Sequence, residues 1–256
     1  EYLTSIKYKL AVASGKGGVG KSTVAVNLAI ALEKEGLSVA LLDADIYGPS
    51  IPLMLGVDIL PPFDGKRMHP IQKFGLHVMS LGFLIDNSEA VIWRGPLVAR
   101  ALQQLMTDVA WPKLDVVIFD MPPGTGDAQL TLSQSVDLDG AVIVSTPQDV
   151  ALIDAVKGVQ MFRRVNVPIL GVIENMSYFE CPKCGEKTEI FSHGGVQKEC
   201  ANLETELLGE IPIDPGIRKG GDQGIPIVFN EPDGSQAKVF RSIASKIKSK
   251  LLLSTM

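Results

Sequence analysis

The sequence predicts an α/β fold with a mostly parallel central sheet flanked by helices. Short runs of apolar and β-branched residues alternate along the chain with segments of helical periodicity. The runs are apolar throughout, which indicates strands that are buried on both faces and covered by helices on both sides. With 256 residues, 46% of them hydrophobic and 21% charged, the chain can bury a large core without metal ions or disulfides.

The expected elements follow one another as strand, loop and helix. The first strand is Tyr8–Ala13, and a glycine-rich loop separates it from a helix over Lys21–Glu35, which Gly36 ends. The later strands are expected at Ser38–Asp43, Asp115–Asp120, Gly140–Ser145 and Pro168–Glu174. The later helices are expected at about Pro96–Val109, Asp149–Arg164, Val196–Leu203 and Ser235–Leu252.

We expect a single domain over residues 1–256, because no repeat, low-complexity tract or linker interrupts the alternation. Two excursions interrupt the regular elements. Pro61–Pro70 contains three prolines, and the segment at about residues 178–195 contains a Cys-x-x-Cys pair among Pro, Lys and Gly residues. Both excursions are therefore expected on the surface.

Composition narrows the class of protein. The net charge is −5, from 24 basic and 29 acidic residues, so we expect no nucleic acid among its partners. No run approaches the ~18 apolar residues of a membrane-spanning helix, and we expect no membrane contact. Three cysteines are typical of a reducing compartment. Since the chain begins at Glu1 without Met, we expect that a leader, a targeting segment or a domain preceded it.

A glycine-rich segment lies between the first strand and the first helix. Residues 15–23, GKGGVGKST, match G-x-x-x-x-G-K-[ST] in the context that a phosphate-binding loop requires. Its glycines let backbone N–H groups turn toward phosphate oxygens. We expect Lys21 to reach the β- and γ-phosphates of ATP and Ser22 to ligate Mg²⁺. The predicted nucleotide-binding residues are Gly15, Lys16, Gly17, Gly18, Val19, Gly20, Lys21, Ser22 and Thr23.

Three aspartates end or follow apolar strands, where α/β sheets place their ligands. Asp120 is expected to hold the Mg²⁺ shell. Asp43 and Asp45 lie two residues apart, so in an extended chain both would point to the same side. We expect one of them to order the metal shell and the other to orient the attacking water, and we assign the water to Asp45.

Cys181 and Cys184 are spaced so that both sulfurs can bind one metal, but they make only half a site. His193 and Cys200 of the same chain would complete a zinc site, although Cys200 lies in a predicted helix and is expected to pack in the core. The pair could instead be a redox dithiol. A second copy of the chain would supply two more thiolates, enough for a [4Fe–4S] cluster. Spacing alone leaves these three possibilities open.

The sequence resembles a known family at these motifs. With Lys16, the loop resembles the deviant Walker-A class of P-loop NTPases, K-G-G-x-G-K-[ST]. From about Ile6 to Ser245 the chain resembles the Mrp/ApbC-type P-loop ATPases, which act as iron–sulfur cluster carriers. The matching stretches are Gly15–Thr23, Leu42–Ser50, Val91–Pro96, Asp120–Leu130, Ser145–Val150, Gly171–Cys184 and Glu210–Pro215.

The resemblance implies a homodimer that binds ATP between its protomers, with Lys16 reaching the partner's nucleotide. It implies that Cys181 and Cys184 hold a labile [4Fe–4S] cluster shared across the dimer. It further implies that Asn175 contacts the adenine base, with Pro212 in the segment that packs beside it. The recipients would be apo iron–sulfur proteins, respiratory complex I among them, in the mitochondrial matrix or the bacterial cytoplasm.

Two other classes share the phosphate loop. Partition and cell-division-positioning ATPases work on DNA or membranes and would offer a basic face or a C-terminal membrane helix, without a Cys-x-x-Cys pair. A metabolic synthetase would need substrate-binding residues beyond the nucleotide site, and none is identified. The cysteine pair therefore favours the carrier.

Overall fold

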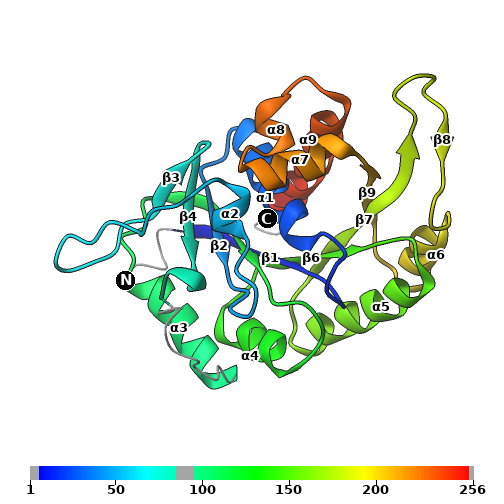
Figure 1. Cartoon of the computed structure of the whole chain (residues 1–256). Helices are drawn as coiled ribbons and strands as arrows, with labels where there is room; N and C mark the ends of the chain where they lie inside the picture. The colour runs from blue at the N-terminus through cyan, green and yellow to red at the C-terminus, as the bar shows by residue number, and fades with distance from the viewer. Residues whose placement is uncertain (1–5, 85–94, 254–256) are drawn as a thin grey trace.

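The computed structural model describes residues 6–84 and 95–253, and its strands belong to one sheet (Figure 1). The sheet has nine strands in these residues, in the order β3-β4-β2-β5-β1-β6-β7-β8, with β9 also paired to β7. The strands are β1 (Ile6–Ala13), β2 (Val39–Asp43), β3 (Ile71–Lys73), β4 (Leu76–Ser80), β5 (Leu114–Asp120), β6 (Gly140–Ser145), β7 (Ile169–Glu180), β8 (Lys187–Thr188) and β9 (Leu207–Ile213).

Most neighbouring strands run parallel, as the sequence predicts. β1 lies between β5 and β6, and β5 in turn pairs with β2, all in parallel register. Only β3 and β8, near the two ends of the sheet order, pair antiparallel to their neighbours within the described residues. The carboxyl ends of β1, β2 and β5 therefore meet at one edge of the sheet. Asp43 and Asp120 are register partners at this edge.

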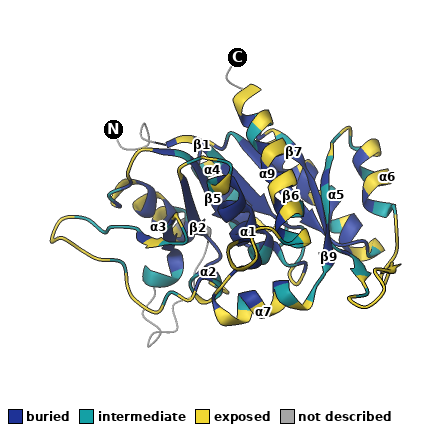
Figure 2. Ribbon diagram, turned by 90° about the horizontal axis from the view of Figure 1, so that it is seen from above, coloured by how far each residue is buried: buried dark blue, intermediate teal, exposed yellow. Residues whose placement is uncertain are grey.

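Helices cover both faces of the sheet and form two apolar layers with it (Figures 1 and 2). One layer contains α1 (Lys21–Lys34), α2 (Ile51–Met54), α7 (Pro215–Gln223), α8 (Ile227–Asn230) and α9 (Ser235–Leu253). The other contains α3 (Gly95–Thr107), α4 (Asp127–Ser135), α5 (Asp149–Arg164) and α6 (Gly195–Asn202). A 3₁₀ turn, η2 (Leu81–Leu84), follows β4. No helix in residues 6–84 and 95–253 is both long and apolar enough to cross a membrane.

The structure adds strands that the apolar pattern does not reveal. β4 contains a histidine and β9 contains a glycine, a glutamate and a proline, so neither is a continuous apolar run. β7 continues six residues beyond the predicted end at Glu174, because the chain resumes extended pairing after Met176, whose φ is 57°. Part of the predicted loop at 178–195 is therefore strand.

Candidate functional site

The phosphate loop joins the end of β1 to the start of α1. Gly18 and Gly20 both have φ near 80°, a conformation that glycine adopts without strain. At Gly15 the limit is space, because a Cβ there would lie 2.0 Å from the carbonyl oxygen of Asp154 in α5. The glycines that the motif requires are thus set by backbone geometry and close packing.

Lys21, Ser22 and Asp120 form a polar cluster at the base of this loop, in which Lys21 and Asp120 are buried and Ser22 is half-buried. Lys21 Nζ lies 2.6 Å from Asp120 Oδ1, and Ser22 Oγ donates a 2.6 Å hydrogen bond to Asp120 Oδ2. The Lys21 side chain is 5% exposed and that of Asp120 is fully buried. Burial raises the pKa of Asp120, and Lys21 opposes that rise. The three residues predicted from two distant motifs therefore lie in direct contact.

Asp43 and Asp45 have different surroundings. Asp43 is fully buried, and its carboxylate accepts hydrogen bonds from the backbone N–H groups of Asp45 and Ile51. Burial, followed by repulsion from Asp120, raises its pKa to about 7. The strand ends at Asp43, so the two-residue period of an extended chain does not apply to Asp45. Repulsion between Asp120 and each of the two carboxylates nevertheless shows that both lie near Asp120. Of the three aspartates, Asp43, Asp45 and Asp120, only Asp45 lines the cavity over the loop that is described next, and its Oδ1 is buried without a hydrogen-bond partner.

A cavity of about 200 Å³ lies over the loop. Lys16, Lys21, Ser22 and Asp45 are among its lining residues, so most of the predicted catalytic and phosphate-contacting side chains face one space. Ser50, Met54 and Pro123 line the same cavity but were not predicted as site residues. Ser50 and Pro123 lie in the stretches Leu42–Ser50 and Asp120–Leu130, whose resemblance to the family could have pointed to them.

Asn175 packs directly against the phosphate loop. Its Nδ2 donates a 2.8 Å hydrogen bond to the carbonyl oxygen of Val19. Asn175 is the register partner of Ile211 in β9, which places Pro212 beside it on the neighbouring strand. The structure therefore brings Asn175 and Pro212 to the nucleotide end of the sheet together.

The cysteine pair lies at the tip of the hairpin that β7 and β8 form (Figure 1). Cys181 donates its backbone N–H to Glu186, and its carbonyl accepts from Gly185, which closes a tight turn. Cys181 is half-buried and Cys184 is exposed. The backbone N–H groups of Lys183 and Cys184 hold the pKa of the Cys181 thiol below its usual value, which favours the thiolate that metals bind.

The other two candidate zinc ligands are not gathered around this pair. Cys200 is buried in α6 among apolar side chains, and burial raises its pKa to about 11. His193 is exposed and lies 3.2 Å from Glu189. Within residues 6–84 and 95–253, no group of three or more His, Cys, Asp or Glu side chains is placed to hold a metal ion.

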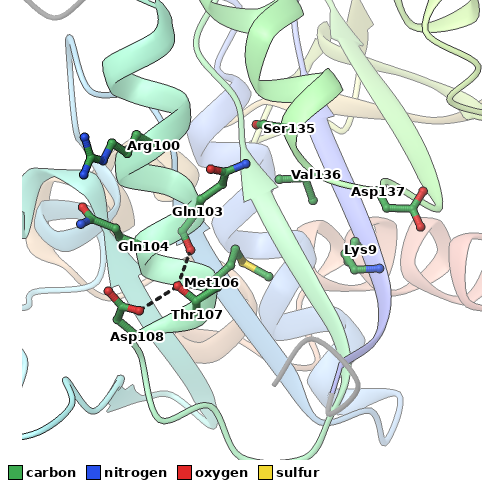
Figure 3. Close-up of a pocket in the computed structure, with 10 residues that line it drawn as sticks. All are labelled: Lys9, Arg100, Gln103, Gln104, Met106, Thr107, Asp108, Ser135, Val136 and Asp137. Carbon is green, nitrogen blue, oxygen red and sulfur yellow. Dashed lines mark hydrogen bonds between the residues drawn. The ribbon is translucent and has the colours of Figure 1, made fainter. Parts of the chain in front are cut away.

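A second cavity, about 630 Å³, lies between α3, the end of α4 and β1 (Figure 3). Arg100, Lys9 and Asp137 are among its lining residues. Lys9 lies in the amino-terminal half of β1, whereas the phosphate loop follows the carboxyl end of this strand. The cavity therefore lies toward the opposite end of the strands from the phosphate loop. None of the predicted site residues lines this cavity. Of the stretch Val91–Pro96, which resembles the family, residues 91–94 lie outside the residues that the structure describes.

Comparisons with known proteins give matches over nearly the whole chain. A family model described as the NUBPL iron-transfer P-loop NTPase, of the ParA type, matches residues 5–248. An "iron-sulfur cluster carrier protein" of Salmonella typhimurium is 48% identical over 251 residues, which cover 97% of this chain and 68% of that protein. A protein of Arabidopsis thaliana, "iron-sulfur protein required for NADH dehydrogenase, mitochondrial", is 48% identical over 247 residues, covering 96% of this chain and 79% of its own.

A solved structure is also similar over most of its length. The nucleotide-binding protein from Archaeoglobus fulgidus, in complex with ADP, has a TM-score of 0.81 and 39% sequence identity to this chain. The match covers 93% of this chain and 94% of that one.

Proposed function

The chain belongs to the NUBPL iron-transfer family of ParA-type P-loop NTPases, and from that premise we propose that it is an ATP-dependent carrier of iron–sulfur clusters. One observation carries the proposal. The cluster of Lys21, Ser22 and Asp120, with its buried ion pair, and a cysteine pair of which Cys184 is exposed are built on the same sheet. The Salmonella typhimurium relative named as a cluster carrier matches 97% of the chain, so the match includes both the phosphate loop and the cysteine pair.

The residues over the cavity fit MgATP. Lys21 would meet the β- and γ-phosphates, and Ser22 offers the cavity a hydroxyl oxygen for Mg²⁺. Asp120 does not line the cavity; buried behind Ser22 and bonded to it, it would contribute its carboxylate to the Mg²⁺ shell from there. When bound, Mg²⁺ would neutralise negative charge on the phosphate oxygens. Asp120 holds Lys21 and Ser22 in place at 2.6 Å. The buried Oδ1 of Asp45, which has no hydrogen-bond partner, is suited to orient the attacking water.

Lys16 would stabilise the negative charge that develops on the γ-phosphate of a partner protomer. It is half-buried and lines the cavity. A dimer would then complete each nucleotide site, and hydrolysis would be slow because it serves as a timed switch. Asp43 would support this site by fixing the backbone of Asp45 and Ile51.

Cys181 and Cys184 would hold the cargo. Two chains related by a two-fold axis offer four thiolates, the ligand number of a [4Fe–4S] cluster. The exposed position of Cys184 suits transfer to an apo iron–sulfur protein. Since one relative is named for NADH dehydrogenase, subunits of respiratory complex I are proposed recipients, in a mitochondrial matrix or a bacterial cytoplasm.

The deciding experiment is iron and sulfide analysis of the protein after anaerobic reconstitution. We expect about four irons per two chains, and loss of the cluster in Cys181→Ala and Cys184→Ala. The matched control is the double variant His193→Ala, Cys200→Ser, which should keep its cluster. A monomer with one zinc per chain, lost in that control, would replace the carrier function with a structural zinc site.

A further inference from the structure

β7 contains an irregularity between the nucleotide site and the cysteine hairpin. Its pairing with β9 goes from Asn175↔Ile211 to Phe179↔Ile213, so four steps along β7 match two along β9. Within this bulge Met176 has a φ of 57°, which is unfavourable for a residue with a side chain. A strained bulge next to a functional site points to a role in that site.

The first half of the bulge touches the phosphate loop. Asn175 donates to Val19 O at 2.8 Å. A Cβ built on Gly20 would lie 2.3 Å from Asn175 Nδ2 and 3.7 Å from the Met176 methyl carbon. Two successive side chains of β7 therefore pack against the last glycine before Lys21. A movement of Val19 or Gly20 would therefore alter the contacts that both side chains make.

The second half of the bulge leads to the cysteine pair. Ser177 Oγ donates a short hydrogen bond to Glu174 Oε1, and this bond spans the bulge. Both residues are buried, at 2% and 1% exposure. β7 ends at Glu180, three residues after Ser177, and its last two residues pair with β8 in the hairpin whose tip holds Cys181.

We propose that the Glu174–Ser177 bulge is a positioning element that couples occupancy of the phosphate loop to the geometry of the Cys181 and Cys184 thiols. The inference rests on the proposed function, because it explains how nucleotide would regulate the cargo. Asn175 and Met176 sense the loop, and the Glu174–Ser177 bond makes the bulge move as one unit. A shift at Asn175 then changes the direction of the hairpin, whose residues Phe179 to Cys181 lie four to six residues further along the chain.

The test measures thiol reactivity in the cluster-free protein. N-ethylmaleimide labelling of Cys181 and Cys184 is followed by peptide mass spectrometry, with and without a non-hydrolysable ATP analogue and Mg²⁺. In the wild type we expect nucleotide to change the labelling rate by at least about five-fold, the lower end of typical allosteric coupling. In Ser177→Ala the change should shrink to less than about two-fold, while affinity for the analogue stays within about two-fold of wild type.

Three further variants make the result specific. Met176→Gly accepts the positive φ without strain and removes the contact with Gly20, so it should also lose the coupling without leaving a buried group unpaired. Glu174→Gln keeps an oxygen that accepts from Ser177 and should retain the coupling. Ser133→Ala is the matched control, a buried serine whose hydroxyl bonds to Gln129 O within α4, and it should retain the coupling too.

Two results would overturn the inference. One is a wild-type labelling rate that nucleotide leaves unchanged, and the other is coupling that persists in both Ser177→Ala and Met176→Gly. Iron and sulfide analysis of the same proteins tests the proposed function separately. A wild type that binds a cluster but shows no nucleotide effect on its thiols refutes the bulge alone, whereas a wild type that binds no cluster refutes the carrier.

Discussion

Replacing Lys21 by methionine removes the cation that lies 2.6 Å from Asp120 Oδ1. With the lysine 95% buried and the aspartate fully buried, the variant leaves a carboxylate without its partner. Losing one member of a buried ion pair costs about 3–5 kcal/mol of unfolding free energy. The loss of a charge-assisted contact with phosphate lowers ATP affinity by about 1.5–3 kcal/mol, or roughly 10–100-fold.

The stability loss of Lys21→Met also depends on pH, with a definite sign. Burial already raises the pKa of Asp120, and removing Lys21 raises it further. A carboxyl group whose folded pKa is raised stabilises the protein at low pH, and that contribution is lost as pH rises through the folded pKa. The variant is therefore expected to be closest to wild type at pH 5 and furthest from it at pH 8.

Urea unfolding at both pH values and titration calorimetry with ATP measure the two effects. Lys34→Met is the matched control, because Lys34 lies on the same helix but is exposed and pairs with Glu33 at 3.3 Å. The control is expected to change unfolding free energy by less than about 0.5 kcal/mol. ATP affinity of Lys21→Met within two-fold of wild type would refute the assignment of the phosphate loop.

Three other expectations concern the same site. Lys16→Ala should weaken ATP binding less than it slows single-turnover hydrolysis, which should fall by about 10²-fold or more; an unchanged rate would make Lys16 an ordinary surface lysine. Wild-type stability should fall between pH 4 and pH 7, because Asp43 titrates at about 7 in the folded protein against 3.8 as its usual value, and Asp43→Asn should flatten that slope in urea titrations. Gly20→Ala should cost more unfolding free energy than Gly18→Ala. Both residues have φ near 80°, but only at Gly20 would the new Cβ lie 2.3 Å from Asn175 Nδ2, and equal costs would contradict this packing.

The parallel core and the contact of Lys21, Ser22 and Asp120 could be predicted because their sequence signals are local. β1, β5 and β6 are continuous apolar runs, and Lys21 and Ser22 lie in a motif whose spacing fixes the loop. Asp120 could be added because its position at the end of an apolar strand places it at the same edge. The topology brings Asp120 within 2.6 Å of Lys21, although 99 residues separate them.

What the sequence did not reveal depends on tertiary packing. Asp43 and Asp45 follow the two-residue period of a strand, but the chain turns where the Asp45 N–H bonds to Asp43. β9 was missed because Gly209 and Glu210 interrupt its apolar run. The bulge at Met176 hides the continuation of β7, since a positive φ at methionine has no signature in composition or periodicity.

The hairpin that holds Cys181 and Cys184 is held together by far fewer strand contacts than the sheet from which it extends. Its two strands meet in only two residue pairs, Phe179↔Thr188 and Glu180↔Lys187, and residues 182–193 are exposed. The amide hydrogens of this hairpin are expected to exchange through local opening of low free energy, while those of β1 and β5 exchange only through global unfolding. Release of the proposed cluster would then require only this hairpin to open. A recipient protein could take the cluster while the parallel sheet and its helices stay folded.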